Sequence, residues 1–212
     1  ITNEKLKIYG LQFHPEVTHT NYGKNIIDNF LFEICFCKKS WTTRNIISDS
    51  IKNIKNTVKK KKVILALSGG VDSTVVAALL KKAINKQLTC IFIDTGLMRK
   101  NEVKEVNDSI SKKLDIRLIT INAQKTFFHK LKGISSPERK RKIIGETFIG
   151  VFEQQSTKIK NVDFLAQGTI YPDVIESSSK NSKSDIIKSH HNVGGLPKNM
   201  KFNLIEPIRE LF

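Results

Sequence analysis

The sequence predicts an α/β fold in which a twisted parallel sheet carries helices on both faces. Short runs rich in Val, Ile and Leu alternate with longer segments whose apolar residues recur at helical spacing, as in strand–helix–strand units. A glycine turn follows the first of these runs directly, at the edge where open parallel sheets bind their ligands. These two observations predict both the fold class and the location of a binding site.

Four segments are predicted to form the sheet. Each is short, mostly apolar and bounded by polar or glycine residues, as expected for strands buried on both faces. In chain order they are residues 63–67, 88–94, 116–122 and 163–169. The lysine run at 58–63 is expected to be a solvated link into the first strand.

Helices are predicted before and between these strands. Their ranges are 43–58, 73–84, 101–114, 123–132 and a long segment from residue 137. The long segment has Ser136 as N-cap, Pro137 at the first helical position and Glu138 in the first turn, all typical of a helix start. Residues 206–212 are expected to enter a further helix.

The first 40 residues are expected to form a separate region. In "LQFHPEV" (11–17), an extended chain would place His14 and Glu16 on the same side. A Cys–His hydrolase needs an imidazole oriented by a carboxylate in this way. A surface histidine at a strand end is the alternative, which a bare His-x-Glu favours. "NYGKNIIDNFLFEICF" (21–36) follows with helical spacing.

The cysteines do not supply the nucleophile that such a pair requires. Cys35 and Cys37 lie in an apolar helical run without glycine, and Cys90 lies in a predicted strand. All three are expected to be small buried apolar side chains. No second ligand pair with zinc spacing follows them. Because neither disulfides nor export is indicated, the expected compartment is the reducing cytoplasm.

The two ends of the sequence suggest a part of a longer protein. The chain begins at Ile1 without a methionine and stops inside an expected helix. The nucleophile that would complete the His14–Glu16 pair is therefore expected upstream of residue 1.

The composition argues against two classes of partner. The net charge is +16, but most of the 36 basic residues are lysines spread along the chain, whereas dedicated nucleic-acid surfaces favour arginine. No apolar run approaches the roughly 20 residues of a membrane span. Neither nucleic acid nor membrane is an expected partner. The arginines are Arg44, Arg99, Arg117, Arg139, Arg141 and Arg209.

The glycine turn in "LALSGGVDSTVVAALL" is the strongest functional signal. Glycines allow a tight turn, and the freed amides at a helix N-terminus bind an anion such as phosphate. Asp72 beside a phosphate implies a bridging Mg²⁺, which makes it a candidate metal ligand. The turn has no lysine after the glycines and is not a Walker A loop. Its candidate nucleotide-binding residues are Ser68, Gly69, Gly70, Val71, Asp72, Ser73 and Thr74.

This loop resembles the SGGxDS loop of the N-type ATP pyrophosphatases, Rossmann-like enzymes that cleave ATP between its α- and β-phosphates. Within that group, three further blocks are similar to the GMP synthetase family. "QFHPEVTHT" (12–20) resembles the end of the class I glutamine amidotransferase domain that precedes the ATP pyrophosphatase domain in that family. The three blocks are "FIDTGLMRKNE" (92–102), "QGTIYPDVIES" (167–177) and "IKSHHNVGGLP" (187–197).

The resemblance implies a two-domain organisation and a two-site reaction. Residues 1–40 would end an amidotransferase domain, and 41–212 would form a truncated ATP pyrophosphatase domain without its C-terminal dimerisation region. A thiolate would release ammonia from glutamine, with His14 as base and Glu16 orienting it. ATP with Mg²⁺ would adenylylate xanthosine monophosphate, and ammonia would displace AMP to give GMP. The partners would be these small molecules and, in the full-length protein, a second copy.

The resemblance also implies roles for residues beyond the loop. Asp173 and Glu176, three apart on a helical turn, would act in catalysis with Lys188. His190 and His191 would belong to a lid within a mobile loop at 176–201. Ile93 and Gly168, at strand ends, would contact adenine through their backbone groups.

Two other functions remain open. A tRNA-modifying ATP pyrophosphatase would suit the net charge but needs reactive cysteines in loops. A non-catalytic nucleotide-binding remnant is the second alternative. Intact SGGVDST, QGTIYPD and SHHNVGG blocks argue against such decay.

Overall fold

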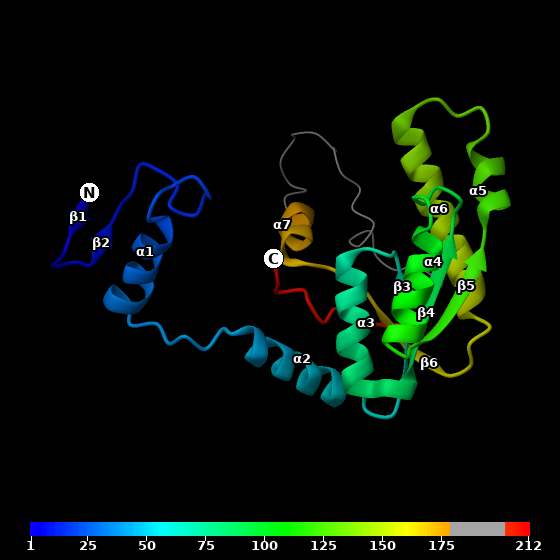
Figure 1. The fold of residues 1–212 in the computed structure, drawn as a ribbon, viewed down its shortest axis with the longest axis horizontal. Coiled ribbons are helices and arrows are strands. Elements are labelled where there is room, and N and C mark those ends of the chain that lie inside the picture. The colour runs from blue at the N-terminus through cyan, green and yellow to red at the C-terminus, as the bar shows by residue number, and fades with distance from the viewer. Residues whose placement is uncertain (179–201) are drawn as a thin grey trace. The chain divides into compact units, whose positions relative to one another are not determined.

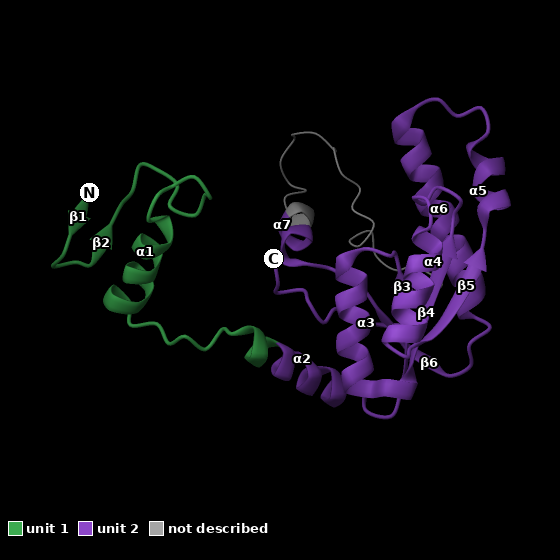
Figure 2. Ribbon diagram, in the orientation of Figure 1, with its two compact units in different colours: residues 1–46 green, residues 47–212 purple. Residues whose placement is uncertain are grey.

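The computed structural model describes residues 1–178 and 202–212. They form two compact units, residues 1–46 and 47–212 (Figure 2). The domain boundary expected near residue 40 stays a prediction.

The larger unit is built on a five-stranded sheet in the order β5-β4-β3-β6-β7, with every adjacent pair parallel. In the register, Leu65 of the central strand lies between Cys90 and Ala166. The predicted parallel α/β fold is confirmed. The strands are β3 (Lys62–Leu67), β4 (Leu88–Asp94), β5 (Arg117–Asn122), β6 (Val162–Ala166) and β7 (Asn203–Ile205).

Helices cover both faces of this sheet (Figure 1). On one face, Leu80 of α3 packs in a cluster with side chains of α2 and α4. On the other face, Phe127 of α5 and Phe152 of α6 pack in a second cluster. All seven residues of β4 are buried, because this inner strand is covered on both faces. Successive residues of β4 pack in opposite clusters, Phe92 in the first and Ile93 in the second.

The helices of this unit lie close to their predicted ranges. At the start of α6, the Ser136 side chain accepts a hydrogen bond from the Arg139 N–H, so the predicted N-cap is confirmed. The predicted helix 101–114 continues beyond α4 as a π-helical segment, Asp108–Lys113. The helices are α2 (Thr43–Val58), α3 (Val71–Ile84), α4 (Glu102–Asn107), α5 (Gln124–Leu131), α6 (Pro137–Ser156) and α7 (Tyr171–Ser178).

Two expectations near the end of this unit are wrong. Residues 207–210 form turns and not a helix, and the Tyr171 N–H donates to the Leu211 carbonyl at 2.8 Å, which ties this segment to the start of α7. The fourth predicted strand is also shorter than expected, because the chain leaves the ladder after Ala166.

The smaller unit contains two short strands and one helical segment. β1 (Thr2–Asn3) pairs antiparallel with β2 (Ile8–Tyr9), and α1 (Gly23–Asp28) continues as a π-helical segment, Asn29–Ile34. Cys35 and Cys37 are exposed, so the expectation that they are buried is wrong. The helical segment ends at Ile34, so both cysteines lie beyond the helix in which they were expected to be buried.

The HPE segment forms turns and not the expected strand. Pro15 has no N–H to donate to a strand ladder. The Thr20 hydroxyl donates to the His14 carbonyl at 2.6 Å, and the Thr20 N–H donates to the Val17 carbonyl at 3.1 Å. These local hydrogen bonds replace those of a sheet.

None of the helices in the described part of the chain is both long enough and apolar enough to cross a membrane.

The packing of α5 predicts the effects of two adjacent substitutions. Phe127 is fully buried, whereas Phe128 is 51% exposed. We expect Phe127→Ala to lower the free energy of unfolding by about 3–5 kcal/mol, because it leaves a cavity in the core. Phe128→Ala is the matched control and should cost clearly less. Urea denaturation of both variants measures the difference. Equal losses in the free energy of unfolding would contradict the burial of Phe127 in the second cluster.

Candidate active site

The phosphate-loop candidate joins β3 to α3. Gly69 has φ +85°, a left-handed conformation that favours glycine. A Cβ added at Gly69 would lie 3.1 Å from Val106 Cγ2 on α4. The next residue, Gly70, is extended, and its N–H donates to Ser68 Oγ at 3.2 Å. The backbone conformation therefore favours glycine at position 69, and the contact with Val106 leaves little room for a side chain there.

The hydroxyl groups of the loop form a local network. Ser73 Oγ and Thr74 Oγ1 both donate to the Gly70 carbonyl, at 3.1 and 2.9 Å. Ser68 Oγ lies 3.1 Å from Ser73 Oγ. The N-cap of α3 is Gly70, which has no side chain to cap the first-turn amides, so these amides keep the character of an anion site. The hydroxyls can turn from the carbonyl to an incoming phosphate oxygen.

Asp72 lies in the first turn of α3 and is exposed. A carboxylate there interacts favourably with the helix dipole, whether or not it binds a metal. Within residues 1–178 and 202–212, no group of three or more His, Cys, Asp or Glu could hold a metal ion. Mg²⁺ is commonly bound by only one or two carboxylates together with substrate phosphates, and a single Asp72 fits that pattern.

The other predicted nucleotide contacts lie at the same edge of the sheet. Parallel strands bring the C-terminal ends of β3, β4 and β6 together. A Cβ added at Gly168 would lie 3.2 Å from the Ser73 nitrogen and 3.3 Å from the Asp72 carbonyl carbon, so this glycine packs against the start of α3. The Ile93 side chain is buried in the opposite cluster. Ile93 as a whole is 2% exposed, and its expected backbone contact with adenine stays a prediction.

Asp94 is a residue of this edge that sequence reasoning missed. It is 7% exposed and ends β4. Its Oδ1 accepts from the Gly96 N–H at 2.9 Å, and its Oδ2 accepts from Gln124 Nε2 at 2.8 Å. Asp94 therefore holds the loop after β4 against α5. The signal available was an acidic residue at the end of a buried strand, directly before a Thr-Gly turn.

The predicted catalytic group is described only in part. Asp173 lies in the first turn of α7, where its Oδ2 accepts from the Ile170 N–H at 3.0 Å. Glu176 lies on the same helix, but its side chain is outside the described residues. Lys188, His190 and His191, with the rest of the expected loop at 179–201, also lie outside them.

In the smaller unit, His14 and Glu16 are paired. His14 Nδ1 lies 2.9 Å from Glu16 Oε1, and the two side chains are 80% and 60% exposed. Hydrogen bonds from the backbone of Glu16 and from His14 lower the pKa of the Glu16 carboxyl. An ionised carboxylate on Nδ1 leaves Nε2 available as a base. The turn thus brings together two side chains that were expected to meet on a strand.

Two family models match the chain in succession. The glutamine amidotransferase class-I model matches residues 1–34, and the NAD synthase model matches residues 43–143. The chain is also 57% identical over 211 residues to the GMP synthase [glutamine-hydrolyzing] of Cellvibrio japonicus, covering 99% of this chain and 40% of that protein. This chain is a GMP synthase homologue.

A second GMP synthase, from Mesoplasma florum, is 58% identical over 212 residues, which are 100% of this chain and 41% of that protein. The chain therefore spans about two fifths of the length of these GMP synthases. Among solved structures, the U34-tRNA thiolase of Methanococcus maripaludis has a TM-score of 0.53 at 20% identity, covering 81% of this chain and 62% of that one. This last likeness shows the fold alone.

The three cysteines of this GMP synthase homologue differ in environment. Burial raises the pKa of the Cys90 thiol to about 12, whereas Cys35 and Cys37 are exposed. The thiolate is the reactive form, and a raised pKa keeps Cys90 protonated at neutral and mildly alkaline pH.

We expect a maleimide or disulfide reagent at pH 8 to modify Cys35 and Cys37 in the native protein and to leave Cys90 unmodified. Denaturation should make Cys90 react as well. Mass spectrometry of the native and unfolded protein distinguishes the sites. Modification of Cys90 at the rate of the other two would contradict its burial in β4.

Proposed function

We propose that this chain belongs to an enzyme that makes GMP from xanthosine monophosphate, ATP and glutamine, an ATP-dependent, AMP-forming ligase of purine biosynthesis. The observation that carries the proposal is the identity of 57% to a glutamine-hydrolysing GMP synthase over 211 residues. That alignment includes both the HPE segment and the glycine loop. The proposal covers the full-length protein, of which this chain would supply the ATP-activating site and part of the glutamine site.

In the ATP half-reaction, the loop Ser68–Thr74 would hold the pyrophosphate part of ATP. The amides at the start of α3 would donate to phosphate oxygens, and the hydroxyls now bonded to the Gly70 carbonyl would turn toward them. Asp72 would hold Mg²⁺, which supplies neutralisation of the charge that develops on the leaving pyrophosphate. Backbone groups of Ile93 and Gly168 would contact adenine.

Around the activated xanthosine monophosphate, Asp173, Glu176 and Lys188 would act in catalysis. The hydrogen bond from the Ile170 N–H to Asp173 Oδ2 supports a fixed position for that carboxylate at the start of α7. In the amidotransferase half-reaction, His14 would be the base and Glu16 would orient it. The attacking thiolate would come from a part of the full-length protein outside this chain.

We also propose an organisation for the full-length protein. Residues 1–40 would close an amidotransferase domain, and 41–212 would belong to an ATP pyrophosphatase domain. The protein would be a cytoplasmic homodimer with small-molecule partners and without a nucleic-acid partner.

A tRNA-modifying ATP pyrophosphatase is the second candidate, because the fold is shared with a tRNA thiolase. That solved thiolase carries a [4Fe-4S] cluster. In the part of this chain that the structure describes, no group of cysteines and other ligands could hold a metal. Cys90 is also sequestered within a strand. GMP synthesis is the better-supported function.

The metal role of Asp72 can be tested by calorimetry on this chain. We expect Asp72→Ala to weaken Mg²⁺-dependent ATP binding at least about tenfold, because the carboxylate that bridges metal and phosphate is lost. Asp49→Ala, an exposed position on α2, is the control and should bind as the parent does. If the magnesium dependence survives in Asp72→Ala, Asp72 is not the metal ligand.

The role of His14 is tested in the full-length protein. We expect His14→Ala to abolish glutamine-dependent GMP formation and to leave synthesis from added ammonium intact, because the two half-reactions use separate sites. Glu16→Ala should lose less, since an orienting carboxylate is less critical than the base. Unchanged use of glutamine by His14→Ala would rule out the proposed pair.

A further inference from the structure

The phosphate loop lacks a cation of its own. Between Ser68 and Thr74 the sequence contains no lysine or arginine, and its one charged residue is the acidic Asp72. The triphosphate of ATP is a polyanion, and phosphate sites commonly combine backbone amides with a lysine or arginine side chain. A positive side chain from another element would complete the site.

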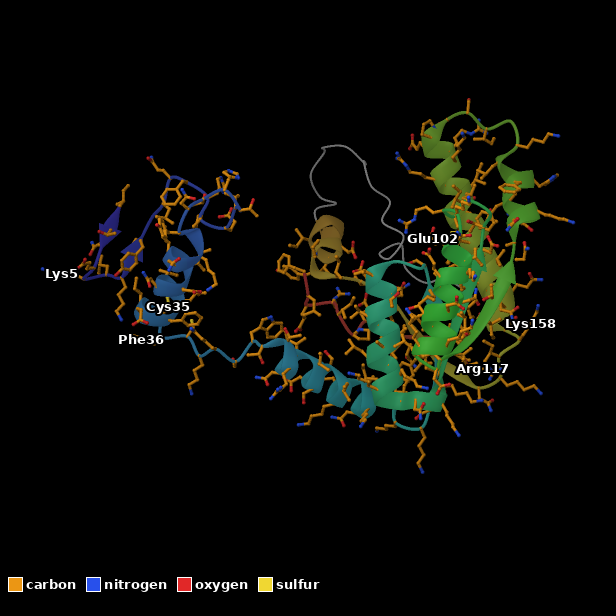
Figure 3. All side chains as sticks on the ribbon, viewed as in Figure 1. Lys5, Cys35, Phe36, Glu102, Arg117 and Lys158 are labelled. Carbon is orange, nitrogen blue, oxygen red and sulfur yellow. The ribbon has the colours of Figure 1, made fainter. Side chains whose placement is uncertain are left out.

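One wall of the loop is formed by the start of α4. The added Cβ at Gly69 lies 3.7 Å from Glu102 Oε1, in addition to its contact with Val106. Figure 3 shows Glu102 on α4, near the N-terminal end of α3. The Glu102 side chain is only 15% exposed. A carboxylate is therefore packed against a loop that is expected to bind an anion, and it needs a positive partner.

Arg99 is that partner. The Arg99 guanidinium donates to Glu102 Oε1 from Nη2 at 3.3 Å and to Oε2 from Nε at 3.4 Å. The backbone N–H of Arg99 also donates to Oε2, at 2.8 Å. The hydrogen bonds to Arg99 lower the pKa of the Glu102 carboxyl, which keeps the pair charged. The Arg99 side chain is 86% exposed, and guanidinium has five N–H donors, so donors remain for a ligand.

We propose that Arg99 is a phosphate-binding residue of the nucleotide site and that Glu102 is its resting partner. In the free protein, Glu102 holds the guanidinium beside the loop. When nucleotide binds, phosphate oxygens replace the carboxylate as acceptors for part of the guanidinium. The backbone hydrogen bond from Arg99 to Glu102 does not require the guanidinium and keeps the turn before α4 in place. This inference rests on the proposed binding of ATP at the loop.

The alternative is that the ion pair only braces the turn before α4. The two roles predict different effects on ligand affinity when the charge of Glu102 is removed. If the pair is a brace, breaking it from either side weakens ligand binding alike. If Arg99 binds phosphate, its loss weakens binding, whereas removing the competing charge of Glu102 does not.

Calorimetry on this chain with Mg²⁺ and ATP, inorganic pyrophosphate or adenosine separates these cases. We expect Arg99→Gln to bind ATP and pyrophosphate at least about tenfold more weakly, the equivalent of one lost charge-assisted hydrogen bond, with adenosine binding unchanged. Arg99→Lys keeps the charge and should fall between Arg99→Gln and the parent. Lys100→Gln removes an exposed neighbouring charge and should change affinity less than about twofold, within the usual effect of a screened surface charge.

Glu102→Gln keeps an acceptor for the Arg99 N–H, and we expect it to bind pyrophosphate at least as tightly as the parent. Equal weakening in Arg99→Gln and Glu102→Gln, or no difference between Arg99→Gln and Lys100→Gln, would overturn the assignment of Arg99. Failure of the parent chain to bind either ATP or pyrophosphate would instead overturn the proposed function, and this inference with it.

Discussion

The candidate nucleotide site depends on the parallel pairing of β3 with β4 on one side and β6 on the other. This pairing is driven by the burial of almost every side chain of β3 and β4, and it places three strand ends at one edge. The glycine loop, the Asp94 turn and the Gly168 segment leave the sheet at that edge. Two of these segments also contact helices at this edge: Gly69 packs on α4, and Gly168 packs on the start of α3.

The parts of the fold that local patterns determine were predicted correctly. Strands such as Leu88–Asp94 are continuous apolar runs, and the start of α6 is specified by a serine cap and a proline within two residues. The three residues of β7 have too little pattern to predict a strand, since only Ile205 is buried. The strand expected at residues 11–17 was wrong because Thr20, just beyond the segment, donates to the His14 and Val17 carbonyls and folds the segment into turns.

The candidate site likewise has residues that local patterns predict and residues whose roles depend on distant parts of the chain. The residues of the glycine loop could be named as candidates from sequence, because a glycine turn before a helix is typical of anion sites. The role of Asp94 depends on Gln124, thirty positions away, and that of Glu102 depends on Gly69. Such contacts arise only when strands pair. The pattern of neighbouring residues in the sequence does not reveal these contacts, and neither does a resemblance of single segments to a family.

The buried carboxylate at the end of β4 has a consequence for how this site can evolve. Asp94 joins the turn at Gly96 to Gln124, and its carbonyl accepts from the Ala123 N–H at 2.9 Å. Gly96 itself has φ +74°, and an added Cβ would lie 2.6 Å from Phe128 Cζ. Substitutions inside this turn thus disturb several buried contacts at once. Tolerated substitutions are expected in the exposed residues that follow, such as Leu97, while the turn stays constant.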